Sequence, residues 1–377
     1  MLRACFLSML LPVLAQSASA QVNNQPIETV PRSTETAIDP YLPARDVMSD
    51  LQEIVTPNGI QETLEIEIGG IRQVLNIRGT DRDNPILLFL HGGPGATEMP
   101  VAWTFQRPWE DYFTVVHWDQ RGAGKTYRIN EADAVEPTLT PDQITSDAIN
   151  VIQFLEGHLD QRKVFLLGHS WGSVIGLRVA MERPDLLHAY IGMGQIIDFL
   201  ENEEVGTERV IAAAETSDKA DAVGGLLDIL PYPDEGQLSL EKTGLQRSWS
   251  VYLGGLAAYR KDADFYFHAP RLAPTHNADD REAMNDGSLY SISNLWPQVA
   301  DVSFKDVETL EVPVIQFLGR HDMTTPPELT ETWMADLQAP FKKQVWLEHS
   351  AHLGMIEQPG VVFMKLVNDV LPLAEAD

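Results

Sequence analysis

The sequence predicts an α/β fold, in which a doubly wound, mostly parallel sheet carries an inserted helical cap domain. Short, continuously apolar runs recur along the chain, and such runs are typical of strands covered on both faces. Helical patterns lie between several of these runs, an alternation that indicates a doubly wound sheet. One helix-like stretch rich in aromatic residues interrupts the alternation between two strands, and this interruption predicts the inserted cap.

Residues 1–20 have the layout of a secretory signal peptide. Arg3 is followed by an apolar run over residues 4–14, and the segment closes on Ala18-Ser19-Ala20. The run is too short to cross a bilayer, so we expect cleavage after Ala20 rather than a membrane anchor. The mature protein is therefore expected to be secreted or periplasmic, with no membrane partner.

The rest of the chain divides into an arm, a core in two parts and a cap. Residues 21–61 are polar and proline-dotted, which indicates an N-terminal arm. The core begins at residues 62–194 with an alternating hairpin that turns at Gly69-Gly70. The cap spans residues 195–297, and the second part of the core spans residues 298–377. The buried strands are predicted at residues 86–90, 113–118, 164–167, 189–193, 314–318 and 345–347.

The clearest predicted helix runs over residues 140–157. Thr140 is placed as its N-cap, Pro141 occupies the first helical position, and Gln143 is placed to complete a capping box. Apolar residues recur at helical spacing from Ile144 to Leu155, which predicts one face packed against the sheet.

The chain is strongly acidic, with 27 basic and 55 acidic residues and a net charge of −28. A field of this sign repels nucleic acids and anionic membranes, so neither is an expected partner. The single cysteine, Cys5, lies in the predicted signal peptide. A cysteine nucleophile and a thiolate metal site are therefore excluded for the mature chain.

Two patterns resemble ligand sites but lack a required residue. Gly122-Ala123-Gly124-Lys125-Thr126 resembles the end of a phosphate loop, but Asp119 stands where the first glycine is required. His349 and His352 are three residues apart without the H-E-x-x-H arrangement of a zinc site. We therefore expect no metal and no cofactor.

Gly168-His169-Ser170-Trp171-Gly172 fits the G-x-S-x-G pattern of a nucleophile elbow. A predicted strand comes immediately before it and a helical pattern over residues 174–181 follows, which is the context that the elbow requires. The glycines are needed because side chains at their positions would clash in the strained turn. Ser170 is the predicted nucleophile, whereas the rival hydroxyl of Ser173 lies inside the helix and is expected to be structural.

The glycine loop His91-Gly92-Gly93-Pro94-Gly95 follows the predicted strand at residues 86–90. Acyl transfer needs two backbone N–H donors for the oxyanion that develops on the substrate. We expect one donor from Trp171, directly after the nucleophile, and the other from Gly93, where the missing side chain lets the backbone approach the substrate. The alternative for this loop is a tight turn without a catalytic role.

A serine nucleophile needs a base, and the base needs an orienting carboxylate. In an elbow-type fold the order along the chain is serine, acid, histidine. Asp322 comes just after the strand predicted at residues 314–318 and is the predicted acid. The rivals Asp301 and Asp306 come before that strand and fit less well.

His352, just after the last predicted strand, is the predicted base. His349 is the rival, but it stands too near the end of the strand for a flexible loop. His321 adjoins the predicted acid and is expected to be a loop residue.

Four motifs together resemble prolyl-iminopeptidase-type serine hydrolases of the α/β-hydrolase fold. They are HGGPG at residues 91–95, DQRGAG at residues 119–124, GHSWGS at residues 168–173 and GRHD at residues 319–322. The similarity covers about residues 62–202 and extends from Val312 to the C-terminus. The resemblance implies this fold, and the release of an N-terminal residue, usually proline, from short peptides without a cofactor.

The predicted cap departs from the pattern of that family. Its aminopeptidases hold the free ammonium of the substrate with cap glutamates, one of them often in a W-x-x-W-E-G context. The nearest stretch here is WSVYLG at residues 249–254, with Leu253 where the glutamate is expected. The carboxylate is then expected from Glu98 or from Glu201, Glu203 or Glu204. The candidate substrate-binding residues are Glu98, Glu204, Trp249 and Tyr252.

Three functions remain open at this point. The first is a proline-iminopeptidase-like aminopeptidase that acts on short peptides through an acyl-enzyme. The second is an esterase or amidase on small neutral acyl substrates, which the apolar and aromatic cap favours. The third is a slow-turnover binding protein on the same fold, against which the intact elbow, glycine loop, acid and base argue.

Overall fold

The computed structural model describes residues 39–375. The predicted signal peptide at residues 1–20 and the first part of the predicted arm lie outside the described residues. The rest of the arm contains helix α2 (Leu42–Leu51), and the chain enters the first strand at Ile60.

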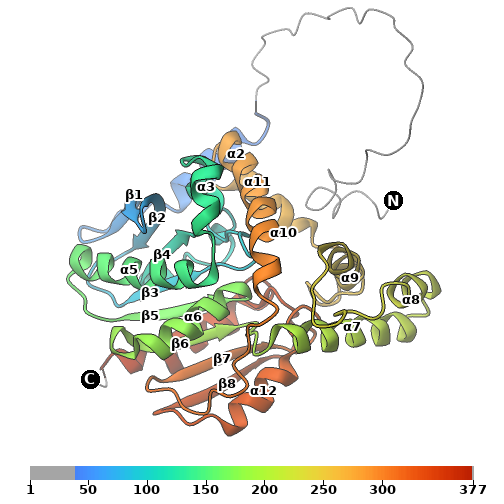
Figure 1. Ribbon diagram of the computed structural model, residues 1–377. Helices are drawn as coiled ribbons and strands as arrows, with labels where there is room; N and C mark the ends of the chain where they lie inside the picture. Colours follow the sequence, from blue (N-terminus) through green and yellow to red (C-terminus); the bar gives the residue numbers. More distant parts are fainter. Residues whose placement is uncertain (1–38, 376–377) are drawn as a thin grey trace, which may run out of the picture.

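The centre of the molecule is an eight-stranded sheet in the order β1-β2-β4-β3-β5-β6-β7-β8 (Figure 1). β2 pairs antiparallel with β1 and with β4, and all the other neighbours are parallel. The predicted fold class is therefore confirmed. The strands are β1 (Ile60–Ile68), β2 (Ile71–Gly79), β3 (Ile86–Leu90), β4 (Thr114–Asp119), β5 (Val164–His169), β6 (Leu187–Met193), β7 (Val314–Gly319) and β8 (Lys342–Leu347).

Apolar side chains on both faces explain why the central strands read as continuous apolar runs. All five residues of β3 are buried. Leu88 and Leu90 belong to the core beneath α5 (Pro141–Leu159) and α6 (Trp171–Glu182). Leu87 and Phe89 belong to the core on the opposite face, which the C-terminal helices cover. Burial on both faces removes the polar alternation that a half-exposed strand would show.

The hairpin β1–β2 turns at the two glycines that the sequence predicted. Ile68 pairs with Ile71, and Gly69 and Gly70 adopt φ of +59° and +79°. A positive φ favours glycine because it carries no Cβ. The alternating pattern of β1 fits its place as the edge strand of the sheet.

Helix α5 begins at Pro141 with Thr140 as its N-cap, as predicted. The Thr140 hydroxyl accepts from Gln143 N at 3.1 Å. The expected capping box is only half formed, because the Gln143 side chain donates to Asp147 Oδ1 at 2.8 Å instead. The buried Asp147 carboxylate therefore takes the place of the Thr140 backbone as the partner of the Gln143 side chain.

The segments between β6 and β7 are helical and include α7 to α9, which extend to one side of the sheet (Figure 1). Within residues 39–375, no helix is long and apolar enough to cross a membrane. The helices of the β6–β7 region are α7 (Phe199–Thr216), α8 (Ala220–Leu227), α9 (Leu240–Tyr252), α10 (Asp264–His268) and α11 (Ala278–Leu295). The remaining α-helices are α3 (Gly124–Arg128), α4 (Ala132–Val135), α12 (Pro327–Asp336), α13 (Gly354–Glu357) and α14 (Pro359–Lys365). The short 3₁₀ turns are η1 (Ala102–Thr104), η2 (Trp109–Asp111), η3 (Glu136–Thr138), η4 (Pro184–Leu186), η5 (Ala269–Leu272), η6 (Trp296–Gln298) and η8 (Leu371–Glu375), and η7 (Leu366–Val370) is a π-helical turn.

Candidate active site

Ser170 lies at the turn between β5 and α6. It adopts φ +54° and ψ −120°, a strained conformation for a residue with a Cβ. A Cβ at Gly168 would lie 2.4 Å from Gly172 O, and a Cβ at Gly172 would lie 2.1 Å from Leu90 O. Neither flanking position accepts a side chain, which is the physical reason for both glycines of the elbow motif.

Asp322 and His352 lie on the loops after β7 and β8, with His352 Nδ1 2.8 Å from Asp322 Oδ2. The N–H groups of Thr324 and Thr325 donate to Asp322 Oδ1 at 2.7 and 2.8 Å, and the Thr325 hydroxyl donates to Oδ2 at 2.6 Å. Burial opposes the charged carboxylate, but the charge of His352 and these hydrogen bonds outweigh it and lower the pKa of Asp322. An ionised acid held at Nδ1 leaves Nε2 as the nitrogen that exchanges a proton with substrate or nucleophile.

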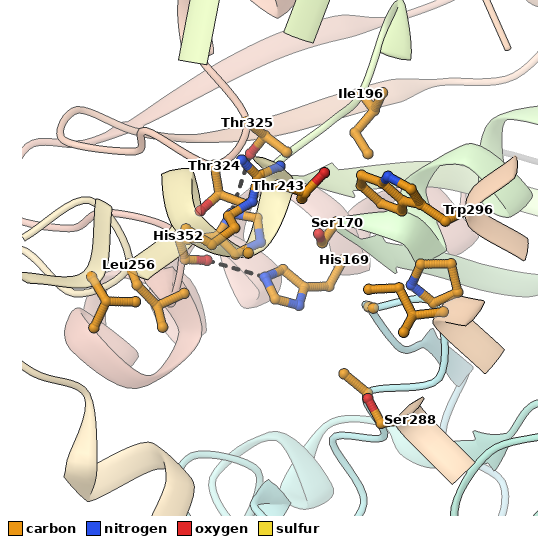
Figure 2. Close-up of a pocket in the computed structure, with 18 of the residues that line it drawn as sticks. His169, Ser170, Ile196, Thr243, Leu256, Ser288, Trp296, Thr324, Thr325 and His352 are labelled. Atoms are coloured by element: carbon orange, nitrogen blue, oxygen red, sulfur yellow. Dashed lines mark hydrogen bonds between the residues drawn. The ribbon is translucent and has the colours of Figure 1, made fainter. Parts of the chain in front are cut away.

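A cavity of about 210 Å³ brings Ser170, His352 and Gly93 together. Figure 2 shows Ser170, His169 and His352 around the same space, with Trp296 close by. The catalytic candidates enter this space from the ends of sheet strands. The apolar lining comes mostly from the region between β6 and β7, namely Ile196, Phe199, Leu240, Val251, Leu256, Tyr266, Phe267, Met284, Leu289, Ile292 and Trp296.

Both residues predicted to donate to the oxyanion lie beside Ser170. Gly93 adopts φ +112°, and a Cβ there would lie 2.5 Å from two backbone nitrogens of the same loop. A Cβ at Gly92 would lie 3.2 Å from Ser170 Cβ, so the loop backbone runs close to the serine. Trp171 is the first residue of α6, where an N–H has no carbonyl partner within the helix.

The segment after β4, which belongs to the DQRGAG motif, holds the glycine loop through hydrogen bonds to His91. Gln120 N donates to His91 Nε2 at 3.1 Å, and the Gln120 side chain donates to His91 O at 3.0 Å. Trp171 Nε1 in turn donates to Gln120 Oε1 at 3.1 Å. Arg121 forms a fully buried ion pair with Asp147 on α5, with an N–O distance of 2.9 Å. The motif therefore ties the glycine loop to the start of α6 and fastens its own segment to α5.

Glu98 and His169 form a second histidine–carboxylate contact, next to Ser170 and His352. His169 Nδ1 is 2.6 Å from Glu98 Oε1, and His169 Nε2 is 3.0 Å from the backbone oxygen of His352. Burial opposes a charged ring, but the hydrogen bond and the charge of Glu98 raise the pKa of His169. Both side chains line the cavity.

The rival catalytic residues have other surroundings. The Ser173 hydroxyl donates to Ser170 O at 2.6 Å inside α6, which is a structural contact. His321 Nε2 lies 2.9 Å from the hydroxyl of Tyr259. No group of three or more His, Cys, Asp and Glu side chains within residues 39–375 could hold a metal ion. The remaining rivals are exposed: His349, Asp301 and Asp306.

Of the four candidate substrate-binding residues, Glu98 lines the cavity and the other three lie outside its lining. Glu204 is exposed on α7. Trp249 packs against a small apolar cluster within the β6–β7 region, and Tyr252 packs edge-on against Trp249 with ring centroids 6.0 Å apart. Positions 240, 244, 247 and 251 of α9 line the cavity instead, because residues three or four apart share one helix face.

The fully buried Glu203 forms an ion pair with the partly buried Arg247 in the cavity wall. Glu203 Oε1 contacts Arg247 Nη2, and Glu203 Oε2 accepts from the Tyr232 hydroxyl at 2.8 Å. Burial opposes the charged guanidinium, but the charge of Glu203 outweighs it and raises the pKa of Arg247. The Glu203 carboxylate that lines the cavity is therefore already paired with the Arg247 guanidinium.

Sequence reasoning did not identify His169, Arg247 or Thr325 as site residues, and it preferred Glu204 to Glu203. A signal for Glu203 was present, because the buried positions 199, 202, 203, 206, 207 and 210 of α7 follow a helical period. Arg247 and Thr325 carry no comparable signal. Their roles depend on partners that only the folded chain brings near.

Comparisons with known proteins agree with this architecture. The sequence matches the alpha/beta hydrolase fold family over residues 85–359. It is 31% identical over 300 residues to "Probable aminopeptidase YbaC" of Bacillus subtilis (strain 168), covering 79% of this chain and 92% of that relative. It is 22% identical over 324 residues to the proline iminopeptidase of Neisseria gonorrhoeae, covering 81% of this chain and 95% of the relative.

A solved structure, the proline iminopeptidase-related protein of Thermus thermophilus, aligns with a TM-score of 0.59 at 20% identity. The alignment covers 84% of this chain and 100% of that one, and it supports the fold alone. The family match spans most of the chain, and the sheet order and elbow described above fit it. The chain is a hydrolase of the α/β-hydrolase fold family and resembles proline iminopeptidases within it.

Proposed function

We propose that this protein is a serine hydrolase that works through an acyl-enzyme on Ser170. The observation that carries the proposal is the 2.8 Å contact between His352 and Asp322 in the cavity where Ser170 sits at a strained elbow. Nucleophile, base and orienting acid follow in the order expected for this fold.

In the first half of the reaction His352 Nε2 takes the Ser170 hydroxyl proton as Oγ attacks the substrate carbonyl carbon. The N–H groups of Gly93 and Trp171 hold the oxyanion. His352 then gives the proton to the leaving group as the bond to the carbonyl carbon breaks. In the second half, water loses a proton to His352 and attacks the acyl carbon; the bond from that carbon to Ser170 Oγ then breaks, and His352 returns the proton to Oγ as the acid product leaves. Asp322 stays ionised and stabilises the imidazolium.

The leading substrate is a short peptide with a free N-terminal residue, as for a prolyl aminopeptidase. Two relatives whose alignments cover about four fifths of this chain are named an aminopeptidase and a proline iminopeptidase. The cavity offers an apolar and aromatic lining for a residue such as proline, including Phe199 and Trp296. Its lining also includes the carboxylate of Glu203, which is the candidate partner of a free amine.

An esterase or amidase on small neutral acyl compounds is the second candidate. The observation that favours it is that both cavity carboxylates already have cationic partners, His169 for Glu98 and Arg247 for Glu203. A substrate ammonium would compete with these partners, whereas a neutral acyl group would need only the apolar lining.

The test compares hydrolysis of prolyl-p-nitroanilide, its N-blocked form and a short-chain p-nitrophenyl ester, with Ser170→Ala as the control. We expect Ser170→Ala to lower kcat by about 10⁴- to 10⁶-fold while circular dichroism shows an unchanged fold. Preference for the free amine supports the aminopeptidase, and activity on the ester alone supports the second candidate. Equal activity in Ser170→Ala and wild type would contradict the serine mechanism. Tight binding without turnover would indicate a binding protein.

A further inference from the structure

Glu98 and His169 form a buried pair that the mechanism above does not use. Their exposed fractions are 1% and 3%, and 71 positions separate them in the sequence. Glu98 lies on the loop after β3, close to the predicted oxyanion donor Gly93. His169 ends β5, one residue before Ser170.

The contacts of His169 determine where its protons lie. Nε2 faces the carbonyl oxygen of His352, which can only accept, so Nε2 carries a proton. Nδ1 faces Glu98, and both oxygens of that carboxyl also accept from Gly92 N at 3.3 and 3.2 Å. The 2.6 Å hydrogen bond to Nδ1 and the charge of Glu98 raise the pKa of His169, so we assign a proton to Nδ1 as well. The pair is then an imidazolium against a carboxylate.

This pair joins the three segments that the reaction needs. Glu98 holds the N–H of Gly92, next to the oxyanion donor. His169 precedes the nucleophile directly and holds the backbone oxygen of His352, with the two imidazole rings 4.8 Å apart. His352 N donates to Leu256 O at 3.1 Å, so the backbone of the base is held on both sides.

We propose that Glu98 and His169 are positioning residues, whose ion pair fixes the glycine loop and the base relative to Ser170. The inference rests on the proposed serine mechanism. It also means that Glu98 is not the anchor of a substrate amine, because its oxygens are already occupied by the imidazolium and by Gly92 N. Misplacement of reacting groups by about 1 Å can lower the rate about 10²-fold, which sets the scale of the expected effect.

The first experiment measures kcat and KM of Glu98→Gln on prolyl-p-nitroanilide and on p-nitrophenyl acetate, which has no amine. A positioning role predicts that kcat falls about 10- to 100-fold on every substrate that the wild type hydrolyses, with KM changed by less than about threefold. A selective rise in KM for the prolyl substrate, with unchanged kcat on the ester, would assign Glu98 to amine binding and overturn the proposal.

The matched control is Glu110→Gln, another buried carboxylate with a cationic partner. Glu110 pairs with Arg78 at 2.7 Å and lies outside the lining of the active-site cavity. We expect it to leave kcat within about twofold of wild type at temperatures where circular dichroism shows a folded protein. An equal loss of kcat in both variants would mean that any buried ion pair matters, and would overturn a specific role for Glu98.

A second measurement does not depend on turnover or on a folded Glu98 variant. The proton NMR spectrum of the wild type should show two low-field resonances, one for each buried histidine–carboxylate contact. Ser170→Ala should keep both, and His169→Gln should remove one and leave that of His352 and Asp322. If the wild type shows only one low-field resonance and His169→Gln does not remove it, the proposed ion pair of Glu98 and His169 is wrong. If the two resonances behave as expected but Ser170→Ala stays fully active, the proposed function fails and the ion pair stands.

Discussion

The two walls of the active-site cavity are held in place by different kinds of contact. The core wall consists of short loops at the ends of parallel strands, and it carries Ser170, Asp322 and His352. Hydrogen bonds of the sheet fix the strands, so these groups lie at set positions. The wall from the β6–β7 region consists of helices, and its polar feature is the pair Glu203–Arg247. Helix packing rather than strand pairing holds most of that wall, so its lining can change while the strand-end loops stay the same.

Backbone contacts nevertheless tie the β6–β7 region to the catalytic loops. Gly255 O accepts from Met323 N at 3.2 Å, directly after the acid. The Glu357 carboxylate accepts from Ala258 N at 2.6 Å and from Ala351 N at 2.8 Å, directly before the base. The β6–β7 region therefore also supports the loops that carry Asp322 and His352. Substitutions on the core wall should mainly lower kcat. Substitutions on the β6–β7 wall should mainly change the free energy of unfolding or the choice of substrate.

The largest effect is expected on the core wall, from Asp322→Asn. The neutral amide cannot hold the Nδ1–H tautomer of His352 or stabilise the imidazolium, so kcat should fall by about 10⁴-fold. Steady-state kinetics on the best substrate will measure this loss, with circular dichroism as the control for folding. A loss below about tenfold would mean that Asp322 does not orient the base.

Asp322→Asn should also change how stability depends on pH. The folded-state pKa of Asp322 is lowered, so its charged form stabilises the protein above the unfolded value of about 3.8, and the contribution is lost as pH falls through the lower folded value. The stability difference between wild type and Asp322→Asn should therefore shrink as pH falls below about 5. Urea denaturation from pH 7 down to the acid limit of folding checks this, and a constant difference would contradict it.

The next effect is expected on the opposite wall, from Arg247→Met. This change leaves Glu203, which is fully buried, without its cation, and breaking a buried ion pair in this way costs about 3–5 kcal/mol. Urea denaturation will measure the loss in the free energy of unfolding. The double variant Arg247→Met with Glu203→Gln should recover much of it, because no buried charge remains. Equal stability of the single and double variants would contradict a charge-pair origin.

A smaller effect on turnover is expected from Thr325→Val. The variant keeps the shape of the side chain but removes the 2.6 Å hydrogen bond to Asp322 Oδ2. A hydrogen bond to a charged group contributes about 1.5–3 kcal/mol, so kcat should fall on the order of 10-fold with little change in KM. Thr325→Ser, which keeps the hydroxyl, is the matched control and should retain most of the activity.

The smallest effect is expected from Tyr259→Phe. The Tyr259 hydroxyl contacts His321 at 2.9 Å and His349 at 3.3 Å, but the residue is 73% exposed. Water can replace the lost contacts, so the free energy of unfolding should change by no more than about 0.5 kcal/mol and kcat by less than twofold. A large fall in kcat would show that this surface contact positions the catalytic loops.

Much of the core follows from local patterns in the sequence. Strands buried on both faces give continuous apolar runs, so β3 and the strands beside it are visible without the structure. The elbow is visible because Gly168 and Gly172 meet backbone atoms where no Cβ fits. Ser170 is recognised by that local requirement. Asp322 and His352 are recognised by their places just after predicted strands.

Only the tertiary structure decided which charged side chains meet in the cavity. Glu98 and His169 are 71 positions apart, and Glu203 and Arg247 are 44 apart. No local pattern links such residues, because their contacts depend on how β3 lies against β5 and how α7 packs against α9. The sequence by itself determined the fold and singled out Ser170, Asp322 and His352 as candidates, because buried strands and the elbow leave local patterns in it. The folded chain decided the charge balance of the cavity, because electrostatic pairing depends on distance in space rather than distance along the chain.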